Sequence, residues 1–282
     1  MRRQGAIEAK NYTVEEQLVC QIARAFGPGD QIAVMSITNC SLVGVALAQR
    51  LYAPDLAVAQ QIKGRKGWVW LSNIILPFPP NKPPEECAEI PFNTEEIFEL
   101  QLAGKLNVLM SPAQIDKFGN MNISVIGDWK RPAAVLAAAR GVPDNTTNGE
   151  RVFYVVNSHS RRVFVEKVDF ICGLGRSAER EKDIKYGKVE KVFSNLGVFD
   201  FEAKTGHMRL KSVHAGVTPQ QVAENTGFKL VVPDPVPETP PPTEEELRLI
   251  KEVIDSRGVR RLDFLKGDAY KQAMAEISAG HK

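Results

Sequence analysis

Apolar segments of two different periods alternate along the first part of the chain. Residues 31–37 form a β-branched, apolar run that is typical of a buried strand. Residues 41–51 then place apolar side chains three and four positions apart, as a helix does, and residues 56–59 are again strand-like. Strands that alternate with helices imply a mainly parallel sheet. This alternation assigns the chain to the α/β class.

The same alternation continues further along the chain. Helices are expected after four threonines that can cap them, namely Thr13, Thr94, Thr218 and Thr243. Strands are expected at residues 67–71, 106–111, 122–126, 152–157 and 163–171. The predicted fold is therefore a mainly parallel open sheet flanked by helices, with ligands at the C-terminal ends of its strands.

A change in composition near residue 232 indicates where the main domain ends. Residues 232–242 are rich in proline, which favours an extended strap at the surface. We expect one α/β domain over residues 1–231, followed by a Pro-rich arm and a helical extension over residues 232–282. The arm either embraces the domain or a partner subunit, or ends in a loosely docked helix, and the sequence leaves both open.

Composition excludes several classes of protein. The 282 residues are 43% hydrophobic and 25% charged, with a formal charge of +2, so no bulk charge points to nucleic acid. No apolar stretch is long enough to cross a membrane. Four cysteines without CxxC spacing predict no metal site, and neither a P-loop nor a complete dinucleotide motif is present. Without a secretory signal, we expect a cytoplasmic protein.

Three polar segments lie beside predicted strand ends, where ligands bind in such sheets. Residues 36–41 precede a helix whose backbone N–H groups are suited to an anion or a thioester oxygen, although Asn39 or Ser41 can equally be an ordinary cap. Residues 114–122 hold more amides than a turn needs. Residues 140–148 place Arg140 before a glycine and a proline, where it either meets a carboxylate or is simply solvated.

Several blocks, read in order, resemble the β subunits of class I CoA-transferases of the glutaconate type. Residues 113–122 (Ala-Gln-Ile-Asp-Lys-Phe-Gly-Asn-Met-Asn) match one signature of that family, and residues 159–169 match another. Residues 52–55 and 224–228 are similar as well. The resemblance implies a CoA-transferase fold, an α-subunit partner in an α2β2 assembly, an acyl-CoA substrate and no cofactor besides the CoA that the substrate carries.

Two departures from that family concern its chemistry. Its transferases use a β-subunit glutamate as nucleophile, and Gln61 stands at that position here. A neutral carboxamide is a poor nucleophile, so the covalent route is closed. The family's glycine-rich loop is also replaced, by residues 140–146 (Arg-Gly-Val-Pro-Asp-Asn-Thr).

Both departures resemble a branch of the family: acyl-CoA hydrolases that cleave a ring C–C bond late in steroid degradation. The resemblance implies hydrolysis with Arg140 as the catalytic residue. The residues expected to bind substrate are Thr38, Asn39, Gln61, Gly141 and Asn145. Those expected to support the site from behind are Gln114, Asn120, Asn122 and His159. Two alternatives stay open: a CoA-transferase or diverged thioester hydrolase, and a non-catalytic partner of a catalytic α subunit.

Overall fold

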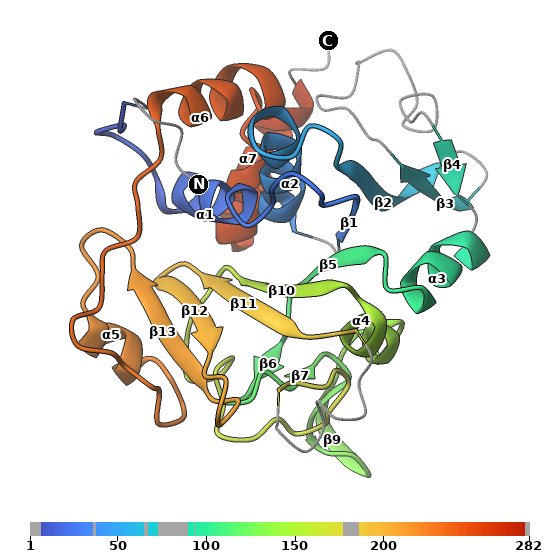
Figure 1. Cartoon of the computed structure of the whole chain (residues 1–282), viewed down its shortest axis with the longest axis vertical. Helices are drawn as coiled ribbons and strands as arrows, with labels where there is room; N and C mark the ends of the chain where they lie inside the picture. The colour runs from blue at the N-terminus through green and yellow to red at the C-terminus, as the bar shows by residue number, and fades with distance from the viewer. Residues whose placement is uncertain are drawn as a thin grey trace. The chain divides into compact units, whose positions relative to one another are not determined.

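The computed structural model describes residues 7–35, 38–64, 67–72, 90–92, 94–176 and 186–279. The chain divides into two compact units, which are described separately (Figure 1). The first unit combines Met1–Phe98 with Pro240–Lys282, and the second consists of Glu99–Thr239. Helix α3 (Thr94–Leu102) contains the boundary between them.

The first unit contains the expected strand–helix–strand segment. Strand β1 (Ile32–Met35) leads through α2 (Asn39–Leu51) to β2 (Ala57–Gly64), and the two strands pair in parallel. Strands β3 (Gly67–Ser72) and β4 (Ile90–Phe92) extend the sheet in antiparallel register. Helix α1 (Val14–Ala23) begins at the capping box of Thr13 and Glu16. Local capping chemistry therefore places this helix where the sequence predicts it.

The C-terminal segment of the chain belongs to this first unit. It forms α6 (Glu244–Arg248), the π-helix η3 (Leu249–Ile254), the 3-10 helix η4 (Val259–Phe264) and α7 (Gly267–Ala279). In Figure 1 these red helices lie beside α1 and α2, and η4 contacts both. Buried ion pairs from Glu16 to Arg260 and from Arg24 to Glu246 attach the segment to α1. Residues 244–264 are thus an integral part of the unit and are not loosely docked.

The second unit has three parallel strands in its sheet, β5 (Leu106–Met110), β10 (Arg151–Val156) and β11 (Val189–Ser194). Strands β12 (Gly197–Phe201) and β13 (Met208–Val213) follow in antiparallel register. Its other elements are two helices, α4 (Val142–Asn148) and α5 (Pro219–Glu224), and two small hairpins, β6 (Gln114–Ile115) with β7 (Met121–Asn122) and β8 (Val125–Asp128) with β9 (Arg131–Val135). Buried aromatic side chains on β10, β11 and β12 form much of its core.

The α/β prediction is confirmed: the parallel strands lie at the centre of the sheet order, and the antiparallel strands follow outside them. The strand expected at residues 163–171 is wrong. Phe164 makes a single bridge to Ile115, and the backbone turns there because Val163 and Phe164 both donate to the carbonyl of Ser160. The apolar residues of this stretch are buried one at a time, which imitates a strand pattern. The strand expected at 122–126 is divided between β7 and β8. Among the described residues, no helix is both long and apolar enough to cross a membrane.

Candidate functional site

Arg140 adopts a backbone conformation that side chains with a Cβ rarely take. Its φ is +50°, and Ala138 two residues earlier has a φ of +61°. Such left-handed residues cost free energy and often mark functional sites. The Arg140 side chain is exposed, and within the described part of the chain no hydrogen bond or ion pair engages its guanidinium. The loop thus presents an uncompensated cation at the start of α4.

Gly141 and Asn145 follow directly on α4. Gly141 is the N-cap residue, and its carbonyl accepts from the backbone N–H of Asn145 (2.9 Å). The Asn145 amide oxygen accepts from Nε2 of Gln101 (2.5 Å), and its Nδ2 lies 3.5 Å from the sulfur of Met110. Asn145 therefore fastens α4 to α3 and β5. The sequence did not point to Gln101, because nothing near it in the chain relates it to this loop.

The start of α2 carries Thr38 and Asn39. The Thr38 hydroxyl accepts from the backbone N–H of Ser41 (3.2 Å), so Thr38 is the N-cap. The backbone N–H groups of Asn39 and Cys40 donate to the two carboxylate oxygens of Asp263, at 3.1 and 2.8 Å. These donors are therefore occupied by the protein itself, and the anion held at this helix start is Asp263. The sequence carries no local signal for Asp263.

Gln61 lies on strand β2, where its backbone is opposite Trp70 of β3. Its side chain is outside the described part of the chain. Thr38, Asn39 and Gln61 belong to the first unit, and Arg140, Gly141 and Asn145 belong to the second.

The amides of residues 114–122 form a closed network in the second unit. Gln114 donates to Asp169 (2.9 Å) and accepts from Asn122 (2.8 Å). Asn120 donates to Asp116 (2.8 Å) and accepts from the backbone N–H of Gly175 (2.9 Å). Asn122 also accepts from the backbone N–H of Ser124. Because these carboxamides bond within the chain, they hold the two small hairpins in shape and are not turned toward a ligand.

His159 is buried among aromatic rings and stacks on Phe164 with 3.7 Å between the ring centroids. Its Nδ1 lies 3.1 Å from the Ser194 hydroxyl and its Nε2 lies 3.1 Å from the Thr226 hydroxyl. Burial lowers the pKa of His159 to about 3. A neutral ring between two hydroxyls supports the core, and it is unsuited to proton transfer near neutral pH.

We expect the two buried histidines of the second unit to make its stability fall in mild acid. Burial lowers the pKa of His214 to about 4, despite a hydrogen bond to the carbonyl of Ser194. Between an unfolded pKa of about 6.5 and these values, the unfolded chain binds more protons than the folded chain, so stability is lost as the pH falls through that window. Each histidine contributes a slope of at most about 1.4 kcal/mol per pH unit.

Thermal unfolding between pH 6.5 and 5 measures this slope, because the carboxylates with lowered pKa act only below that range. His159→Gln should be less stable at every pH and should show about half the wild-type slope. A slope that is the same in the variant and the wild type would contradict the assignment.

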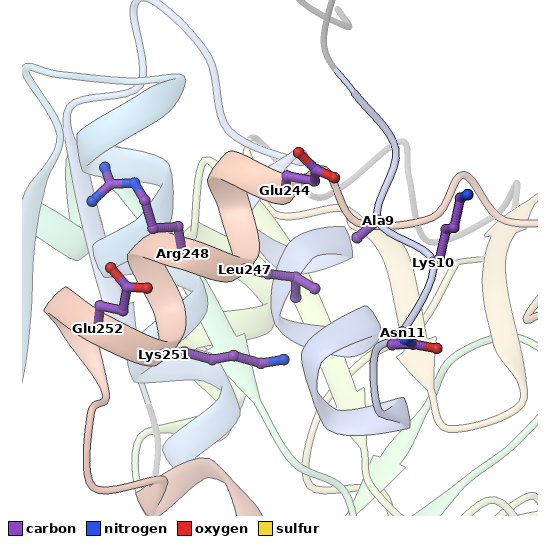
Figure 2. Close-up of a pocket in the computed structure, with 8 residues that line it drawn as sticks. All are labelled: Ala9, Lys10, Asn11, Glu244, Leu247, Arg248, Lys251 and Glu252. Atoms are coloured by element: carbon purple, nitrogen blue, oxygen red, sulfur yellow. The ribbon is translucent and has the colours of Figure 1, made fainter.

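A shallow pocket of about 390 Å³ lies between the N-terminal segment and the C-terminal helices of the first unit (Figure 2). None of the predicted site residues lines it. Two of its three basic side chains are already paired, Arg248 with Glu245 and Lys251 with Glu16. It is a surface hollow with mixed charge and has no feature of an acyl-CoA site. In the described residues, no three His, Cys, Asp or Glu side chains cluster as metal ligands do.

The sequence matches known proteins over most of its length. A family model described as coenzyme A transferase matches residues 74–225. The cholesterol ring-cleaving hydrolase IpdB subunit of Mycobacterium tuberculosis is 35% identical over 255 residues, which are 86% of this chain and 95% of that protein. One of the glutaconate CoA-transferase subunits of Acidaminococcus fermentans is 28% identical, over 87% of this chain and 93% of the relative.

The structure is similar to solved structures of related proteins. The crystal structure of Rhodococcus jostii IpdAB matches with a TM-score of 0.77 and 32% identity, covering 91% of this chain and 100% of that chain. The glutaconate coenzyme A-transferase of Acidaminococcus fermentans matches with a TM-score of 0.70 and 23% identity, covering 91% and 99% of the two chains, which supports the fold alone.

Proposed function

Because the chain belongs to the coenzyme A transferase family, we propose that it is the β subunit of a heteromeric acyl-CoA hydrolase that cleaves a ring carbon–carbon bond. The substrate would be a cyclic, steroid-derived CoA thioester resembling a β-diketone. The identity to a cholesterol ring-cleaving hydrolase subunit over nearly its whole length supports this choice. The partner would be an α subunit in an α2β2 complex, and no cofactor is needed besides the CoA of the substrate.

The observation that carries the proposal is the free guanidinium of Arg140 on a left-handed residue. A permanent cation with no partner in its own unit is suited to a substrate carboxylate or to a developing oxyanion. The transferase reaction, in contrast, requires a nucleophilic carboxylate at the position that Gln61 occupies.

The proposed reaction is a retro-Claisen hydrolysis. A glutamate of the α subunit removes a proton from water, and the resulting hydroxide adds to the ring ketone. The tetrahedral intermediate then expels a carbanion as the ring C–C bond breaks. Protonation of this carbanion completes the addition of one water molecule, and the thioester stays intact. Arg140 would stabilise the oxyanion or hold a carboxylate in place, and Asn39 and Gln61 would bind the substrate through hydrogen bonds.

The test is to co-express the chain with its α subunit and to identify the products by mass spectrometry. Ring cleavage adds the mass of one water and leaves the CoA attached. Thioester hydrolysis releases a free thiol, and transfer makes the CoA ester of an added carboxylate. We expect the first product; CoA transfer to the acceptor would overturn the proposal in favour of a transferase. Complete activity of the α subunit alone would establish the chain as a non-catalytic partner.

A further inference from the structure

Asp263 makes three hydrogen bonds to the first turn of α2, from a position 224 residues away in the sequence. One carboxylate oxygen accepts from the backbone N–H of Asn39 (3.1 Å) and from its Nδ2 (2.8 Å). The other accepts from the backbone N–H of Cys40 (2.8 Å). A carboxylate is stable at a helix N-terminus because it meets free N–H donors and the positive end of the helix dipole.

The position of Asp263 is set by buried charges in the same unit. Asp263 lies on η4, whose Arg260 donates to Asp255 (2.9 Å) and to Glu16 of α1 (2.7 Å). All three of these side chains are buried. The backbone N–H of Arg260 also donates to Asp255 (3.1 Å). The helix that carries Asp263 is therefore held rigidly against α1.

The carboxylate also decides which way the Asn39 amide points. An ionised carboxylate can only accept hydrogen bonds, so the NH2 group of Asn39 must face it. The amide oxygen then faces away from Asp263. Among the described residues, this oxygen has no hydrogen-bond partner, and the Asn39 side chain is only half-buried.

We infer that Asp263 is a positioning residue that orients Asn39 so that the asparagine presents its amide oxygen as a hydrogen-bond acceptor in the site. This inference rests on the proposed function, which places Asn39 in the site. The matching group is a hydrogen-bond donor, either the attacking water or an O–H or N–H group of the acyl-CoA.

The test is a mutant cycle on the complete α·β complex. Asn39→Ala and Asp263→Asn should each lower kcat/KM by about tenfold to a hundredfold. In the Asn39→Ala background, Asp263→Asn should have little further effect, because the group that it orients is gone. An equal loss in both backgrounds would overturn the inference, since Asp263 would then act without Asn39. Asp268→Asn is the matched control, because this exposed aspartate of α7 pairs only with Lys271, and its activity should be unchanged.

Exchanging the two side chains gives a second readout. Asn39→Asp alone places two carboxylates together and should lose activity about a hundredfold. The pair Asn39→Asp with Asp263→Asn restores a donor facing an acceptor and leaves an oxygen turned outward, so it should recover most of the loss. No recovery would contradict the assignment of an acceptor. A fall in kcat with KM unchanged identifies the donor as water, whereas a rise in KM identifies a substrate group.

Failure of the proposed function is distinguishable from failure of this inference. If the complex transfers CoA instead of cleaving a ring, the same variants are measured on the transfer reaction. A full effect of the cycle there would leave the role of Asp263 standing. If Arg140→Ala inactivates ring cleavage but Asn39→Ala does not, the function stands and the inference is overturned.

Discussion

Replacing Arg140 with alanine is expected to lower kcat/KM of the α·β complex by about a hundredfold or more. The guanidinium is the one cationic group that the loop of residues 140–146 offers, and no described residue neutralises it. Because it has no partner in its own unit, its removal should change the free energy of unfolding by less than about 0.5 kcal/mol. Steady-state kinetics and thermal unfolding of the complex measure the two quantities. Arg161→Ala, which removes an exposed arginine of the same unit, should leave both unchanged.

Arg140→Gly separates the backbone strain from the charge. Glycine accepts the φ of +50° without the penalty that a Cβ causes, so this variant should be more stable than the wild type by roughly 1 kcal/mol. It should lose as much activity as the alanine variant. Near-wild-type activity in either variant would remove Arg140 from the site.

Replacing Glu246 with alanine is expected to lower the free energy of unfolding by about 3–5 kcal/mol. The Glu246 side chain is fully buried and accepts from Arg24 at 2.8 and 2.5 Å and from the Tyr52 hydroxyl at 2.7 Å. Burial by itself would raise the pKa of Glu246, but the hydrogen bond and charge of Arg24 outweigh it and the pKa is lowered. Its loss leaves a largely buried arginine without its counter-ion, which is why the expected cost is large.

Urea unfolding of the complex, together with limited proteolysis of the C-terminal segment, measures this effect. The neighbouring Glu245 is the matched control, because its pair with Arg248 is exposed on both sides. Glu245→Ala should cost less than about 1 kcal/mol. Adding Arg24→Ala to Glu246→Ala should cost less than the sum of the two single changes, because the unpaired charge is removed as well. Equal losses for the two glutamates would contradict the role given to Glu246.

Local signals in the sequence predicted much of the fold. The capping boxes at Thr13, Thr218 and Thr243 are all present, because a capping box depends on groups only three residues apart. The first strand–helix–strand segment is confirmed for the same reason, since its periodicity lies within short windows. The blocks that resemble the CoA-transferase family are confirmed by the family match.

The strand expected at residues 163–171 shows how the same local reasoning fails. Phe164 and Val168 are buried, so the stretch has an apolar pattern. The burial comes from separate contacts in a turn, including the stack on His159, and does not come from a pleated backbone. A pattern of apolar residues reports that side chains are buried and cannot report what buries them.

For the candidate site, the sequence by itself determined which residue types are available: an arginine where the transferases have glycines, and a glutamine where they have a nucleophile. Only the tertiary structure decided how these residues are held. It gave Arg140 a left-handed backbone, closed the amides of residues 114–122 into a network and brought Asp263 to Asn39. The physical reason is range: the carboxylate of Asp263 contacts a helix start 224 residues earlier, and such a hydrogen bond leaves no periodic trace in the sequence near either residue.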